Sequence, residues 1–365
     1  MNRRDRALTA LDHREPDAVP IWELGIDPPH AESITGKQWI GTSKETNLDR
    51  RGIERHNADI MVECHNKLDF VMIRAISSDP DGWRPQRFPD GTFTDEWGRI
   101  RMYDPRTKST IPFRTLIKTP EDFEAMAFPD AHAPGRMYGL EYVVKRVKGD
   151  MAVAAEVRAP FATAWEMLGV TGFCQILHEK PQFIRKVIEK MTDFNIELIK
   201  MVVDAGADMI VSNGDIAEKN GPMVSPKYFD QIFLPNMKRE VEAAHKKGVK
   251  FIKHTDGDLN LILEGLANTV DGLHSLDPSA SMDIEYVKEK YGKRLVLMGN
   301  VSVDKLCRGT KDEIVKDTKR CIRVAAPGGG YFLNSSNTWY ADAKLENCMA
   351  MVETGRKFGK YPIKL

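Results

Sequence analysis

Short apolar runs alternate with longer amphipathic stretches along the chain of 365 residues. The apolar runs are rich in Val, Ile, Leu and Phe and are bounded by polar residues, which predicts buried β-strands. Eight such strands are expected, at residues 19–24, 70–75, 152–157, 209–213, 250–254, 270–276, 294–300 and 330–336.

The stretches between these strands carry the spacing of helices. Residues 181–206, 225–248 and 310–329 place apolar side chains three or four positions apart and end at Gly. Alternating strands and helices predict a parallel sheet covered by helices, and eight units close into a single (β/α)8 barrel, the TIM barrel. A doubly wound open sheet is the alternative, but no Gly-x-Gly-x-x-Gly follows the first strand.

One segment interrupts the alternation between the second and third strands. Residues 87–105 place an Asp90-Gly91 turn between alternating side chains, which predicts a β-hairpin. We expect an excursion at about 84–118 that covers the barrel mouth, within one domain spanning residues 1–365.

Composition excludes several classes of protein. Lys+Arg and Asp+Glu both number 53, so the basic excess typical of nucleic-acid or membrane-surface binders is missing. The sequence contains no run of eighteen apolar residues, so no transmembrane helix is expected. Residues 1–17 lack the apolar region of a secretory signal. Five cysteines with no Cys-x-x-Cys pair form neither a disulfide framework nor a zinc ribbon, so a cytoplasmic location is expected.

Polar and aromatic side chains follow nearly every expected strand. In an α/β barrel the carboxyl ends of the strands form the active site, so convergence of these residues favours a catalytic or binding pocket. For single members a structural role is the alternative, such as capping of the next helix by Asn213 or Asn300. The set comprises Trp22, Glu23, Glu156, Arg158, Asn213, Asp215, His254, Asp256, His274, Ser275, Asn300, Ser335, Ser336, Asn337, Trp339 and Tyr340.

Five blocks of sequence resemble the uroporphyrinogen decarboxylase superfamily. They occur in the expected order and span nearly the whole chain, at residues 6–23, 213–238, 254–259, 291–303 and 328–353. The resemblance implies an α/β barrel, in agreement with the strand count, and suggests a homodimer.

The superfamily implies either decarboxylation of a tetrapyrrole with eight carboxylates or methyl transfer to or from the cobalt of a corrinoid protein. Its decarboxylases carry paired arginines after the first strand, as a polyanionic substrate requires. This chain has no Arg between Arg14 and Arg50, and Asn337 stands where those enzymes have the His of a Gly-His-Gly element. Both departures disfavour the tetrapyrrole reaction.

Methyltransferases of this superfamily that act on thiols imply a zinc site, with a His-x-Cys pair after the fifth strand and a second Cys after the eighth. Here His254 and Asp256 occupy the first place and Asn337 lies near the second, so both thiolates are missing. A harder metal held by His254 and Asp256, or a proton donor without metal, are the two alternatives.

The chain resembles most closely the methyltransferases that demethylate methoxylated aromatics. The resemblance implies acid assistance at the ether oxygen, with His254 as proton donor at its ordinary pKa and Asp256 beside it. Asp215, Glu156 or His274 are alternatives that tune or replace it. Walls for an aromatic ring are expected from Trp22, Trp165, Trp339 and Tyr340. Substrate-binding residues are expected to be Trp22, Glu23, Asn213, His274, Asn300, Ser336, Asn337 and Trp339.

The corrinoid is expected on a partner protein. Residues 130–135, DAHAPG, match the Asp-x-His-x-x-Gly of corrinoid-binding proteins, but no strand-to-helix turn or Ser-x-Leu accompanies them. Two other functions stay open: a decarboxylase of a small carboxylate or tetrapyrrole, and a non-catalytic corrinoid- or porphyrin-binding module.

Overall fold

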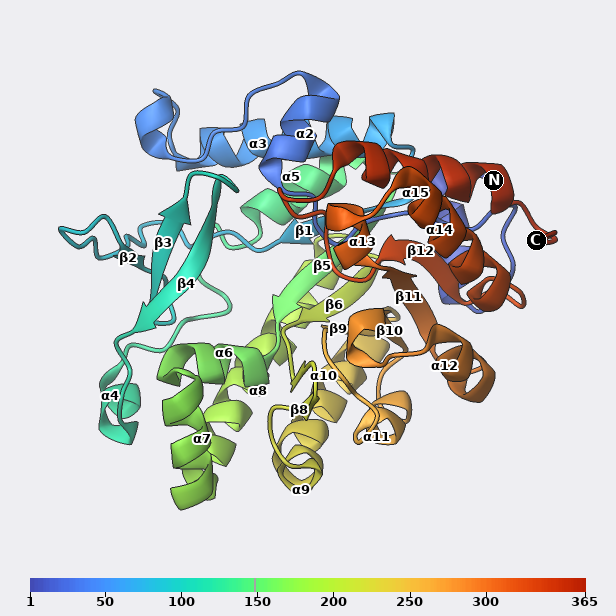
Figure 1. The fold of residues 1–365 in the computed structure, drawn as a ribbon. Helices are drawn as coiled ribbons and strands as arrows, with labels where there is room; N and C mark the ends of the chain where they lie inside the picture. Colours follow the sequence, from blue (N-terminus) through green and yellow to red (C-terminus); the bar gives the residue numbers. More distant parts are fainter. Residues whose placement is uncertain (148) are drawn as a thin grey trace.

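A curved parallel sheet of seven strands occupies the centre of the molecule (Figure 1). The computed structural model describes every residue except Lys148. Neighbouring strands pair in parallel, and most of their residues are buried, as expected for a sheet with both faces covered. In spatial order the strands are β1 Met72–Ile76, β5 Ala152–Arg158, β6 Met209–Asn213, β9 Lys250–Thr255, β10 Gly272–Ser275, β11 Val296–Val301 and β12 Tyr331–Ser335.

Residues 19–24 form no regular strand, in contrast to the prediction, but Ile21 makes a parallel bridge to Leu333 of β12. The segment instead makes backbone hydrogen bonds to both sides: Leu333 N donates to Pro20 O at 2.9 Å, and Val71 N donates to Ile21 O at 3.1 Å. Pro20 has no N–H to give to a ladder, and pairing with β12 is limited to one bridge, in which Trp22 N donates to Leu333 O at 3.3 Å. The segment lies between β12 and the residue preceding β1.

Helices surround the sheet on its outer side (Figure 1). They are α1 Arg3–Leu11, α2 Pro28–Thr35, α3 Arg50–Lys67, α4 Pro120–Ala125, α5 Tyr138–Val147, α6 Pro160–Leu168, α7 Val170–Glu179, α8 Pro181–Asp204, α9 Pro226–Tyr228, α10 Leu234–Lys246, α11 Leu263–Ala267, α12 Ile284–Tyr291, α13 Val303–Arg308, α14 Lys311–Ala325 and α15 Leu345–Phe358. The helix predicted at 225–248 is divided by a π-helical turn, Phe229–Phe233. Pro235 explains the division, because it lacks the N–H that a continuous α-helix would use.

A small antiparallel sheet lies beside the barrel, where the sequence predicted a hairpin (Figure 1). It contains β2 Phe93–Thr94, β3 Arg99–Asp104 and β4 Ser109–Thr115. Trp97, in the turn between β2 and β3, packs edge-on against Phe128 and Phe194, with centroid distances of 5.3 and 5.1 Å. These aromatic contacts attach the small sheet to the main body.

Among the helices that the structure describes, none combines the length and apolar content needed to span a bilayer.

Glu23 fixes the segment that lies between β12 and β1. Its carboxyl group is buried and accepts hydrogen bonds from Ser335 N at 2.7 Å and Ser335 Oγ at 2.8 Å. Burial raises the pKa of Glu23 to about 8, because the charged form is poorly solvated there. Glu23, expected from sequence as a substrate-binding residue, therefore joins the two ends of the chain.

We expect Glu23→Gln to change the pH dependence of stability. The pKa of Glu23 rises from 4.5 to about 8 on folding, so its contribution to stability is present below pH 4.5 and is lost as pH rises towards 8. Denaturant unfolding should show the wild type losing up to ~1.4 kcal/mol per pH unit across this window relative to the variant.

The matched control is Glu353→Gln, which changes an exposed glutamate of α15 and should follow the wild type. Parallel curves for the wild type and Glu23→Gln would contradict the assignment of a raised pKa to Glu23.

Candidate active site

Three ionisable side chains meet at the carboxyl ends of two adjacent strands. Asp215 follows β6, His254 is the last residue but one of β9, and Asp256 follows β9. One ligand atom from each lies within 4.8 Å of the others. The two loops are joined directly, because the Asp256 amide donates to Asp215 Oδ1 at 3.0 Å. The sequence prediction that Asp215, His254 and Asp256 converge agrees with this arrangement.

His254 forms a pair with His274 of the next strand. The two residues are register partners on β9 and β10, and their Nδ1 atoms are 2.7 Å apart. Burial lowers the pKa of His254 to about 3, with the charges of Lys253 and Arg158 adding to the effect. Burial also lowers the pKa of His274 well below its ordinary value. Both rings are neutral at pH 7, so the expectation that His254 titrates near its ordinary pKa is wrong.

Asp256 has the opposite shift. Ser275 Oγ donates to its Oδ1 at 2.6 Å, and Asn337 Nδ2 donates to its Oδ2. Burial and then the negative charge of Asp215 raise the pKa of Asp256 to about 7. A carboxyl group with this pKa exchanges its proton near neutral pH, which suits a general acid or base.

Two further polar residues after β12 lie next to this cluster. Ser336 O competes with Asp256 Oδ1 for the single hydroxyl hydrogen of Ser275, while Ser336 Oγ accepts from the Val303 amide at 3.1 Å. Asn337 contacts the cluster directly through Asp256. Thus Asn337 belongs to the site, whereas Ser336 supports the loops around it.

The predicted aromatic walls have different positions. Trp22 is fully buried and lies edge-on to His274, with centroids 6.1 Å apart. Trp339 is also fully buried and packs against Phe70. Trp165 Nε1 donates to Asp215 O at 3.4 Å, which places it beside the site, and Tyr340 is 40% exposed.

Three other predicted residues lie around the cluster. Glu156 forms an ion pair with Arg74 at 2.9 Å. Asn213 is the register partner of His254, and its Oδ1 accepts a hydrogen bond from Arg158 at 3.4 Å. Asn300 donates to Leu276 O at 2.8 Å and accepts from Arg320 at 3.0 Å, so its amide ties the loop after β10 to α14.

Lys253 is a residue that the sequence reasoning missed. Its side chain is fully buried, and Nζ donates to Ser212 O at 3.3 Å, to Gly214 O, and to His254 O at 2.7 Å. These carbonyls precede Asp215 and Asp256, so one ammonium group fixes both loops. A lysine inside the apolar run KFIKH was the available signal, since buried lysines require such partners.

The cluster suits some cations better than others. Asp215, His254 and Asp256 offer oxygen and nitrogen atoms, and this described set contains no cysteine. Such donors fit a hard or borderline divalent cation, and they do not supply the thiolates of a zinc site that activates thiols.

Comparison with known proteins relates the chain to two activities on one fold. The profile of the family "Uroporphyrinogen decarboxylase (URO-D)" matches residues 103–358. A methylcobamide:CoM methyltransferase, MtaA of Methanosarcina barkeri, is 25% identical over 61% of this chain and 67% of its own length. A uroporphyrinogen decarboxylase of Aliarcobacter butzleri is 23% identical over 68% and 72%, respectively.

A solved structure shows the same fold over nearly the full length. A methyltransferase from Methanosarcina mazei superposes with a TM-score of 0.75, at 21% identity, over 98% of this chain and 99% of that one.

We expect Lys253→Met to destabilise the protein. The substitution leaves buried carbonyl groups without a donor and should lower the free energy of unfolding by about 2–4 kcal/mol. Chemical denaturation near neutral pH measures this change. Lys250→Met, at the start of the same strand, removes only a partly exposed ion pair with Asp271 and should cost less than about 1 kcal/mol. Equal midpoints for the two variants would show that Lys253 does not hold the loops.

Proposed function

This chain belongs to the uroporphyrinogen decarboxylase family, and we propose that it is a corrinoid-dependent methyltransferase of that family. The methyl donor is a small methoxylated aromatic compound, and the acceptor is the Co(I) corrinoid of a separate protein. The observation that carries the proposal is the cluster of Asp215, His254 and Asp256 at the carboxyl ends of β6 and β9, where burial raises the pKa of Asp256 to about 7 and suits it to donate a proton.

The charge of the site favours methyl transfer over the decarboxylase reaction. Asp215 and Asp256 lie together with the neutral His254, and Arg158, a cation near the cluster, is already paired with Glu166. Lys253, the nearest buried cation, uses its ammonium on three backbone carbonyls. A substrate with many carboxylates would be repelled here.

The reaction requires help at the oxygen of the ether. Co(I) attacks the methyl carbon with its electron pair, the carbon–oxygen bond breaks, and that bonding pair stays on the oxygen. A phenolate leaves reluctantly, so a proton delivered to the oxygen lowers the barrier. Asp256 delivers this proton, and the products are the phenol and the methylated corrinoid.

The remaining residues orient this acid. Ser275 and Asn337 fix the two oxygens of Asp256, and the negative charge of Asp215 helps to keep its proton bound at neutral pH. His254, neutral and fixed by His274, presents Nε2 to a ligand. Glu156 forms an ion pair with Arg74 at the edge of the site.

In the alternative to proton donation by Asp256, a divalent cation held by Asp215, His254 and the deprotonated Asp256 would supply Lewis-acid assistance at the ether oxygen. Asn337 contacts Asp256 and would orient that carboxylate towards the cation.

We expect Asp256→Asn to lower methyl transfer by about 10²–10⁴-fold, because a general acid contributes about that much. The assay mixes the protein, a methoxyarene and a reduced corrinoid protein, and follows the spectral change from Co(I) to methylated cobalt together with release of the phenol. The wild-type rate should fall as pH rises through about 7, where Asp256 loses its proton, and the variant should lack this step.

Asp258→Asn is the matched control, because Asp258 lies on the same loop and caps Asn260 instead of facing the cluster. Near-normal turnover in Asp256→Asn would refute the assignment of the acid. Release of carbon dioxide from a carboxylate would favour the decarboxylase, and binding without turnover would favour the non-catalytic module.

Any divalent metal that copurifies with the protein should have only oxygen and nitrogen ligands. Elemental analysis and X-ray absorption of protein purified without chelator measure the metal and its shell. Asp215→Ala should weaken its binding at least about tenfold, because it removes one of three ligands. One equivalent of zinc with sulfur ligands would contradict this prediction.

A further inference from the structure

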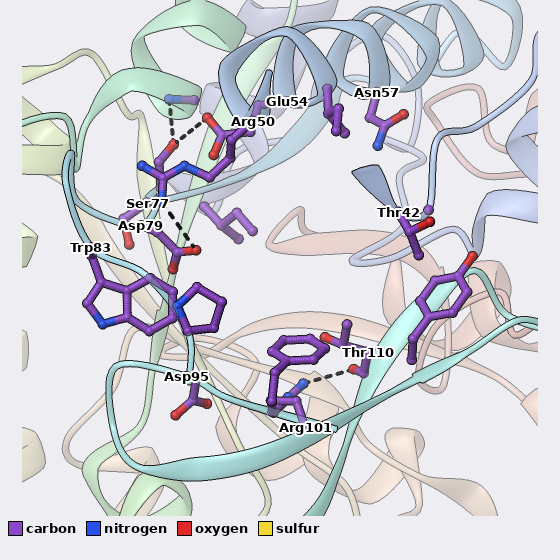
Figure 2. Close-up of a pocket in the computed structure, with 18 of the residues that line it drawn as sticks. Thr42, Arg50, Glu54, Asn57, Ser77, Asp79, Trp83, Asp95, Arg101 and Thr110 are labelled. Atoms are coloured by element: carbon purple, nitrogen blue, oxygen red, sulfur yellow. Dashed lines mark hydrogen bonds and ion pairs between the residues drawn. The ribbon is translucent and has the colours of Figure 1, made fainter. Parts of the chain in front are cut away.

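A large cleft lies between α3, the segment after β1 and the small antiparallel sheet (Figure 2). Its volume is about 1990 Å³, and Glu156 and Arg158 at the end of β5 form its inner boundary. In Figure 2, Glu54 and Asn57 of α3 lie across the opening from Arg101 and Thr110 of the small sheet. Asp215, His254 and Asp256 are not among the residues that line this cleft.

Most charged groups of the inner cleft are already paired. Arg74 binds Glu156 at 2.9 Å, and Arg99 binds Asp95 at 2.6 Å. Glu166 accepts hydrogen bonds from both Arg99 and Arg158. These pairs neutralise the cations at the boundary with the barrel.

Arg101 is a half-buried cation of the cleft without such a partner, whereas Arg84 and Arg87, which also line the cleft, are exposed. Among the residues that the structure describes, no carboxylate lies within ion-pair distance of Arg101, and its guanidinium donates one hydrogen bond, to Thr110 O at 2.8 Å. Burial and then the neighbouring charge of Arg99 lower its pKa. A half-buried cation with most of its donors free is costly unless an anion joins it.

Two apolar residues flank Arg101 on the small sheet. Phe93 and Pro112 are its register partners on the two neighbouring strands, so both flank it on the face that lines the cleft. Tyr103, two residues along β3, lines the cleft on the same face. Trp83 stands on another wall of the cleft (Figure 2). A cleft lined by aromatic rings and a guanidinium suits a planar ligand that carries an acidic group.

The cleft is connected to the candidate active site. Arg158 hydrogen-bonds Asn213, which is the register partner of His254.

The volume of the cleft exceeds the roughly 300–1,000 Å³ typical of small-molecule pockets. An aromatic ring therefore fills only the part of the cleft beside Arg101. Arg101 and α3 also precede the residues that match the family profile, 103–358.

We propose that Arg101 binds the carboxylate of an aromatic acid in this cleft. This inference rests on the proposed function, and it restricts the class of methyl donors to methoxylated aromatic carboxylates. The guanidinium holds the carboxylate through two N–H groups, and the ring lies against Phe93 and Tyr103.

Binding of two matched probes to the full chain tests the proposal, with no corrinoid present. Titration calorimetry compares para-methoxybenzoate with its neutral methyl ester. The acid should bind the wild type at least about tenfold more tightly than the ester, since hydrogen bonds to charged groups contribute that much or more. Arg101→Gln should abolish this difference, and Arg101→Lys should retain part of it because the charge remains but the fork is lost.

Arg114→Gln is the control on the same sheet. Arg114 pairs with Asp90 at 3.1 Å and is absent from the lining of the cleft, so binding should stay at the wild-type level. Equal melting temperatures verify that the variants are folded.

Unchanged binding in Arg101→Gln, or equal binding of acid and ester by the wild type, would overturn the proposal. So would displacement of the acid by inorganic phosphate at similar concentration, which would indicate a general anion site. Binding of the acid that depends on Arg101, without methyl transfer, would refute the proposed function alone. Methyl transfer from methoxyarenes with no role for Arg101 in binding would refute this inference alone.

Discussion

The parallel register of β6, β9 and β10 is the constraint on which the site depends. It places Asn213, His254 and His274 in one row, because partners in neighbouring strands lie side by side. Alternation along β9 then directs Lys253 to the other side of the sheet from His254. From there its ammonium reaches the carbonyls that lead into Asp215 and Asp256. The same burial that fixes these groups keeps His254 neutral and raises the proton affinity of Asp256.

Much of the fold could be predicted from the sequence, because parallel strands that are covered on both faces consist of nearly continuous apolar runs. Seven of the eight expected strands are present, and the rule on strand ends brought Asp215, His254 and Asp256 together. The prediction of a strand at residues 19–24 did not hold, because this short segment has the composition of a strand but Pro20 lacks a backbone N–H donor.

Other features could not be predicted because they depend on how deeply a side chain is buried and on segments that are distant in the sequence. The charge state of His254 follows from how completely its loops exclude water, which the order of residues does not reveal. Arg101 was read as one position in an alternating hairpin. Its lack of a carboxylate partner among the described residues appears only when α3 and the segment after β1 surround it.

The Nδ1 contact between His254 and His274 has a chemical consequence. One proton is shared by two neutral rings, so the pair has two tautomeric states of equal charge. When His254 Nδ1 holds the proton, its Nε2 carries a lone pair and can ligate a cation. When His274 Nδ1 holds it, His254 Nε2 carries hydrogen and donates to an oxygen. His274 Nε2, buried and without a partner among the described residues, takes the complementary form in each state. The change from ligand to donor at constant net charge therefore needs three proton movements: one across the 2.7 Å contact between the Nδ1 atoms, one onto His254 Nε2 and one off His274 Nε2.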